Sequence, residues 1–131
     1  MAITSNVEKN HTLANALDVK DNGQPIQVPR GNNNQLQWQL VGTANTLQFF
    51  PVNDPNYPAI KFVGTPLPPT GTFTNYTLLG NGNILQIDDN NPSGGGPWTY
   101  QLNAHDSMGV RYSTIASTLT ATTNDPKIKN T

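Results

Sequence analysis

The chain has 131 residues, of which 34% are hydrophobic and only 11% are charged, and seven basic against eight acidic residues give a net charge of −1. Nucleic acids and anionic membrane surfaces are bound through basic patches, so this balance argues against both kinds of partner. The absence of cysteine excludes disulfides, thiol nucleophiles and thiolate metal sites. The length suits one domain over residues 1–131 with a single hydrophobic core.

The N-terminal residues 1–11 show neither a charged n-region nor an apolar h-region. We therefore expect no signal peptide, and a cytoplasmic location by default. No run of about 18 apolar residues is present, so we expect no membrane insertion. The segment 1–11 is predicted to be a flexible or edge part of the domain.

Strict alternation of apolar and polar residues gives the clearest strand predictions, "QLQWQL" (35–40) and "WTYQLNAH" (98–105). It predicts that Trp38 and Trp98 are buried and that Asn103 and His105 lie on the polar face. Further strands are expected over 13–20, 25–29, 46–50, 59–64, 73–79, 84–88, 110–115 and 118–122. No stretch carries a convincing helical stripe.

Turn residues separate the predicted strands, including Asn-Gly pairs in "DNG" (21–23) and "GNG" (80–82). The proline-rich segment 51–71 is expected to be edge strand and loop, because proline cannot donate to a sheet ladder. Eight to ten short strands joined by turns predict an all-β fold, a single antiparallel β-sandwich.

"NAHDSM" (103–108) places a histidine, a carboxylate and a methionine close together. A blue-copper site would add a cysteine to this set, and the chain has none. His105 falls at the end of a predicted strand, and Asp106 and Ser107 open a turn. A structural or surface histidine is therefore the favoured interpretation, with metal ligand and catalytic base as alternatives.

"IDDNNPSGGG" (87–96) concentrates oxygen atoms that could bind calcium, with Asp88, Asp89 and Asn91 as the candidate ligands. The spacing is not that of an EF-hand, and adjacent carboxylates point apart in an extended chain. An ordinary hairpin loop is favoured, and no metal ion or other cofactor is predicted.

Tyr57 lies in "NDPNYP" (53–58) and is the best candidate for an exposed aromatic side chain. With Asp54, Asn56 and Phe62 it forms the predicted binding surface, because an apolar patch rimmed by polar residues is typical of interaction sites. The alternative is that these residues cap the core between the two sheets.

The C-terminal third reads "WTYQLNAHDSMG", then "VRYST", then "NDPKIKN" (124–130). It resembles the DP-EP family, small bacterial β-sandwich proteins of uncharacterised function. The upstream "LQWQL" and "TLQFFPV" fit the same layout. The resemblance implies an immunoglobulin-like or cupredoxin-like sandwich without copper and carries no functional residues to this chain.

No G-x-S-x-G elbow is present, and most acidic residues fall at predicted turns. We therefore expect a protein that is not an enzyme, a module that binds a protein partner or assembles with itself as a homo-oligomer. The alternative is a carbohydrate- or surface-binding module, either calcium-dependent or not, because an exposed ring and nearby amides can hold a sugar.

Overall fold

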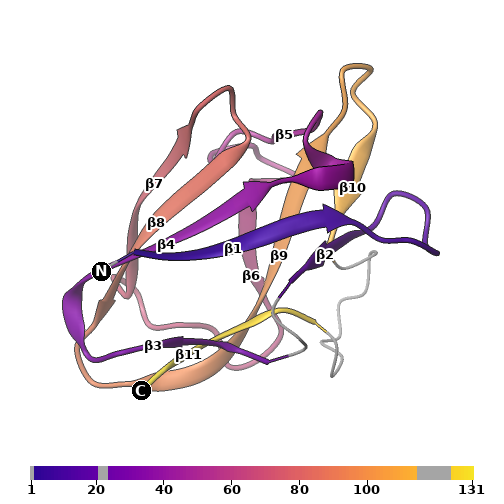
Figure 1. Ribbon diagram of the computed structural model, residues 1–131. Helices are drawn as coiled ribbons and strands as arrows, with labels where there is room; N and C mark the ends of the chain where they lie inside the picture. Colours follow the sequence, from indigo (N-terminus) through magenta and orange to yellow (C-terminus); the bar gives the residue numbers. More distant parts are fainter. Residues whose placement is uncertain (1, 21–23, 115–124) are drawn as a thin grey trace.

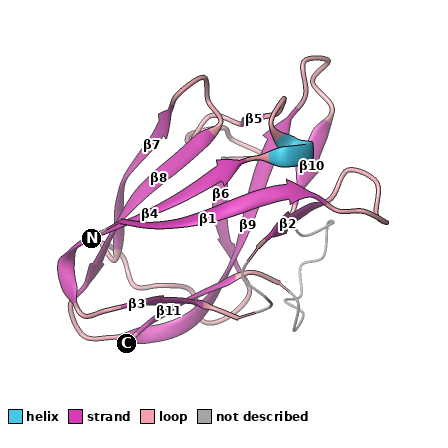
Figure 2. Cartoon of the chain, viewed as in Figure 1, coloured by secondary structure: helices cyan, strands magenta, loops and turns pink. Residues whose placement is uncertain are grey.

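The computed structural model describes residues 2–20, 24–114 and 125–131. In these residues the chain forms eleven strands and one short 3₁₀ helix, η1 (Gly42–Ala44). The strands make two sheets, and Figure 2 shows η1 as a single turn beside the ends of β4 and β1. The predicted all-β sandwich is confirmed.

The first sheet has five strands and lies across the front of the view in Figure 1. Its order is β2 (Leu17–Val19), β1 (Ala2–Lys9), β4 (Gly31–Leu40), β8 (Ile84–Asn91) and β7 (Phe73–Leu79). The β1–β4 pair is parallel and the other pairs are antiparallel.

The second sheet is built around the long strand β9 (Gly95–His105). The other members are β10 (Arg111–Ser113), β11 (Lys127–Asn130), β3 (Ile26–Val28), β5 (Gln48–Phe49) and β6 (Ile60–Val63). The strands β11 and β3 are parallel, and β10, β11, β5 and β6 each pair antiparallel with β9.

The core lies between the two sheets, where alternate residues of facing strands point inward. Trp38 of β4 is fully buried and Trp98 of β9 is 4% exposed, as the alternation predicts. The indole of Trp38 donates to the hydroxyl of Tyr100 across the sandwich at 2.9 Å, and the two rings meet edge to face. A buried Trp N–H thus finds the partner that it needs in an apolar interior.

Several predictions of the sequence are corrected by the sheet topology. The sheets are mixed rather than wholly antiparallel, because a period of two fixes which face is buried but not the direction of the neighbouring strand. Residues 2–9 of the segment 1–11 form β1, which is not an edge strand because it lies between β2 and β4. The turn at 21–23 and the strand at 118–122 lie outside the described residues.

The region 87–96 is mostly strand rather than loop, because β8 continues to Asn91 and β9 begins at Gly95. Residues 92–94 alone connect the two strands. In the described parts of the chain, no helix is long and apolar enough to cross a membrane.

Candidate functional site

The loop 50–59 interrupts the strand pairing along one side of β9. Strand β5 ends at Phe49, which pairs with Ala104, and β6 begins at Ile60, which pairs with Leu102. Only Asn103 stands opposite the gap between these two pairs. Because three prolines in this loop have no N–H to give to a ladder, the chain leaves the sheet and folds over its outer face.

Asn103 is hydrogen-bonded to both ends of the loop 50–59. Its carbonyl accepts from the N–H of Phe50 at 3.1 Å, and its N–H donates to the carbonyl of Ala59 at 3.0 Å. Its side-chain amide donates to the carbonyl of Pro58 at 2.8 Å. Asn103 is therefore fully buried, although it lies on the polar face of its strand.

The side-chain oxygen of Asn103 is used as well. It accepts from Nε of Arg111 at 3.0 Å and from Nη2 of the same guanidinium at 2.8 Å. Hydrogen bonds from a charged donor are stronger than those between neutral groups. The orientation of Arg111 is thereby fixed by a buried partner.

Tyr57 is positioned from two sides. The carboxylate of Asp54 accepts from the N–H of Tyr57 at 2.6 Å and from that of Asn56 at 3.1 Å, which closes the turn before the tyrosine. The guanidinium of Arg111 lies over the Tyr57 ring, 4.0 Å from its centre. Tyr57 is nevertheless 43% exposed.

Four side chains form a continuous row, here called the aromatic row. The ring of His105 meets Phe50 edge to face at 5.1 Å, Phe50 lies 6.0 Å from Tyr57, and Arg111 covers Tyr57. His105, Phe50 and Arg111 are half-buried. The row therefore presents the exposed Tyr57 ring on a support of packed side chains.

The predicted binding residues divide between two faces of the second sheet. Tyr57, Asp54 and Asn56 lie together in the loop on the outer face. Phe62 pairs with Tyr100 on the inner face and stacks on Phe73 at 4.8 Å. Phe62 is therefore not part of the surface around Tyr57, because neighbouring strand residues on one face cannot reach the other.

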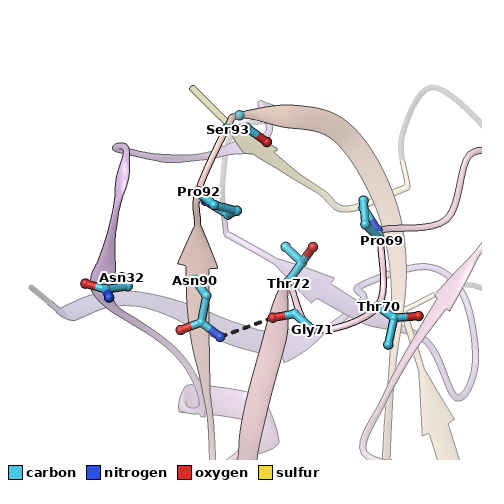
Figure 3. Close-up of a pocket in the computed structure, with 9 residues that line it drawn as sticks. Asn32, Pro69, Thr70, Gly71, Thr72, Asn90, Pro92 and Ser93 are labelled. Atoms are coloured by element: carbon cyan, nitrogen blue, oxygen red, sulfur yellow. Dashed lines mark hydrogen bonds between the residues drawn. The ribbon is translucent and has the colours of Figure 1, made fainter.

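A neutral groove lies at the end of the first sheet, between the turn 69–72 and the connection 92–94. Its volume is about 390 Å³, and Figure 3 shows Asn90 between Asn32 and that turn. The amide of Asn90 donates to the carbonyl of Gly71 at 3.2 Å and to the hydroxyl of Thr74 at 3.0 Å. The lining carries no charge: Asn32, Pro69, Thr70, Gly71, Thr72, Asn90, Pro92, Ser93 and Gly94.

An apolar hollow of about 310 Å³ lies on the other side of the turn 69–72 and shares Pro69, Thr70 and Gly71 with the groove. Tyr76, which is 38% exposed, lines it together with Phe62 and Phe73. An exposed ring therefore stands close to a neutral surface of amides and hydroxyls.

The three calcium candidates do not point to one place. Asp88 faces outward and accepts from the amide of Asn75 at 2.7 Å, whereas Asp89 and Asn91 are fully buried on the inner face. The amide of Asn91 donates to the carbonyl of Val28 at 3.0 Å, and its oxygen accepts from the N–H of Gly94. The alternation of β8 therefore separates the two adjacent carboxylates.

Asp89 contacts Asn130 of β11, whose amide donates to Asp89 Oδ1 at 2.9 Å. The other oxygen of each side chain, Asp89 Oδ2 and Asn130 Oδ1, is buried without a partner. Burial raises the pKa of Asp89 from 3.8 to about 6, and the bond from Asn130 offsets part of this rise.

Other acidic side chains hold turns and strand ends. Asp106 accepts from the N–H groups of Met108 and Val110, and so closes the hairpin after His105. Asp18 accepts from the amide of Asn10. Within the ranges that the structure describes, no three histidine or acidic side chains are grouped as for a metal ion.

Two parts of the site were missed by sequence reasoning. Arg111 gave no signal, because nothing in "VRYST" indicates that it would lie over a loop fifty residues earlier in the chain. Inward-facing Asp89 did give one, since Leu85, Ile87 and Asp89 continue a period of two. Ending the predicted strand at Asp88 hid this signal.

Comparison with known proteins adds no relative: no family model, no curated protein and no solved structure matches the chain.

Proposed function

We propose that the protein is a non-catalytic module that binds a protein surface, either of a partner or of a second copy of itself, through the aromatic row. The observation that carries this proposal is that Tyr57 is exposed to solvent while its position is fixed by its neighbours. Tyr57 is 43% exposed, although its N–H is bound by Asp54 and one face of its ring is covered by Arg111.

The composition of the row supports a protein partner. Tyrosine, phenylalanine and arginine are enriched in the cores of protein interfaces, and tyrosine and arginine are common hot spots. The support is also rigid, since Asn103 binds the loop and Arg111 through five hydrogen bonds of 2.8 to 3.1 Å with four residues. A surface held in place before binding loses less conformational entropy when a partner docks.

The absence of catalysis is part of the same proposal. The acidic side chains of the loop and the hairpin, Asp54 and Asp106, are engaged with backbone N–H groups. Nδ1 of His105 lies 2.9 Å from the carbonyl oxygen of Asp106, and its ring contacts Phe50. These contacts give the polar groups structural roles. The resemblance to the DP-EP family adds no residue to them.

The test compares two exposed tyrosines, Tyr57 in the row and Tyr76 in the apolar hollow. Sedimentation of the purified protein and of its mixture with a candidate partner is measured for Tyr57→Ala and for Tyr76→Ala as the matched control. We expect Tyr57→Ala alone to lose association while it keeps its fold. Equal association in both variants would contradict the proposal.

A second candidate function, the binding of a neutral carbohydrate, is favoured by the neutral groove and the hollow lined by aromatic rings that flank the turn 69–72. Amides and hydroxyls can bond sugar hydroxyls, and the Tyr76 ring offers a stacking surface. Here the roles of the two variants are reversed. A glycan that binds the wild type and Tyr57→Ala, but not Tyr76→Ala, would support this function.

A further inference from the structure

Asp89 and Asn130 join the two sheets from the inside of the sandwich. Asp89 belongs to β8 of the first sheet and is fully buried, and Asn130 belongs to β11 of the second sheet and is 1% exposed. The single bond between them runs from the Asn130 amide to Asp89 Oδ1 at 2.9 Å.

The two atoms left over are on the same two side chains. Asp89 Oδ2 and Asn130 Oδ1 are both buried and both lack a hydrogen-bond partner. If the carboxyl is ionised, both atoms can only accept, and each costs free energy as an unsatisfied buried group. A proton on Oδ2 makes it a donor, and a carboxylic acid and a primary amide then each give one hydrogen bond and accept one.

We propose that Asp89 is protonated in the folded protein and closes a two-bond pair with Asn130, which acts as a proton-dependent latch between the two sheets. The second bond runs from Oδ2–H of Asp89 to Oδ1 of Asn130. No oxidant, metal ion or other molecule is needed to complete it.

The surroundings of the pair are neutral. In the strand pairing, Asn34 of β4 and Phe73 of β7 flank Asp89, and Val28 of β3 lies nearby through its bond with Asn91. The charged groups on these elements have other partners. The carboxylate of Asp88 accepts from the amide of Asn75. The ammonium of Lys127 donates to the carbonyl of Asp125, that of Lys129 donates to the carbonyls of Gly95 and Gly96, and exposed Arg30 donates to the carbonyl of Thr131. No cation described near the pair favours the ionised form.

The direction of the pH dependence follows from the pKa of Asp89, which burial raises from 3.8 to about 6. The folded state then binds the proton more tightly than the unfolded state does, so protonation stabilises the fold. The contribution is full below about pH 4 and is lost as the pH rises through about 6. Above that range the latch opens, and the end of the sandwich that holds β11 loses one of its links to β8.

The variant Asp89→Asn tests the latch, because its amide can give and accept the same two bonds at any pH. Thermal midpoints are measured from acid to mildly alkaline pH for the wild type, for Asp89→Asn and for Asp88→Asn, the outward-facing control. We expect the wild type and the control to lose stability as the pH rises, whereas Asp89→Asn changes less and exceeds the wild type at alkaline pH. Identical pH profiles for all three would overturn the proposal.

A direct titration removes the dependence on a variant that could fold poorly. The carboxyl carbon of Asp89 is followed by NMR in the wild-type protein across the same pH range. We expect its pKa to lie well above the ordinary value of 3.8. A pKa at or below that value, or a stabilisation by added calcium or sodium that Asp89→Asn abolishes, would show that no proton closes the pair.

Discussion

Two buried polar clusters of this sandwich, around Asn103 and around Asp89, differ in how completely their hydrogen bonds are made. At Asn103, the amide, the side-chain oxygen and both backbone groups have partners. At Asp89 and Asn130, one oxygen of each side chain has none. The comparison teaches that one cluster is complete and fixes the loop under Tyr57, whereas the other needs a proton to complete its hydrogen bonds.

The largest expected effect comes from removing the complete cluster. Asn103→Leu keeps the branched shape of the side chain but leaves Arg111 and the carbonyl of Pro58 without their buried partner. We expect a loss of about 3–4 kcal/mol in the free energy of unfolding, measured with denaturant. The control is Gln37→Leu, which breaks the bond to Gln86 on the outer face of the first sheet and should cost less than about 1 kcal/mol. Equal losses of stability in Asn103→Leu and Gln37→Leu would show that the buried contacts of Asn103 contribute no more than an exposed hydrogen bond.

The incomplete cluster should make stability depend on pH. With a pKa raised from 3.8 to about 6, Asp89 contributes about 3 kcal/mol below pH 4, and this is lost by about pH 7. The difference in unfolding free energy between the wild type and Asp89→Asn isolates this contribution from other titrations. A difference that does not change with pH would break the comparison, since both clusters would then behave alike.

Sequence periodicity predicted the faces of the strands but not what covers them. The alternation over 98–105 correctly placed Trp98 inward and Asn103 on the polar side. It could not show that Asn103 is buried, because Asn103 is covered by the loop 50–59, which has no periodic pattern. The strand β1, "AITSNVEK", lacks a strict alternation because the buried position 5 is a serine, and its parallel pairing with β4 depends on a partner thirty residues away. Local pattern carries no information about such pairing.

A smaller effect is expected at the turn that positions Tyr57. Asp54→Ala removes the acceptor of the N–H groups of Asn56 and Tyr57. We expect a loss of about 1–2 kcal/mol, since charged acceptors form the stronger hydrogen bonds. Amide hydrogen exchange should quicken over 54–58 and stay unchanged in β8. Faster exchange in both regions would mean that Asp54 supports the whole fold rather than the loop.

The smallest effect on stability is expected for Tyr57→Ala. The residue is 43% exposed, and the contact of its ring with Arg111 contributes about 0.5–1 kcal/mol at an exposed site. Thermal unfolding should therefore change little. A loss of about 3 kcal/mol or more, as for a buried aromatic residue, would favour the alternative that Tyr57 caps the core.

The most direct test of the binding surface places a photo-crosslinking phenylalanine derivative at position 57 and, in a second protein, at position 76. Each is irradiated in the cells that produce the protein and in concentrated purified solution. The account predicts a protein adduct from position 57, with a partner or with a second copy, and none from position 76. An adduct from position 76 alone, or none from position 57 in either setting, would contradict it.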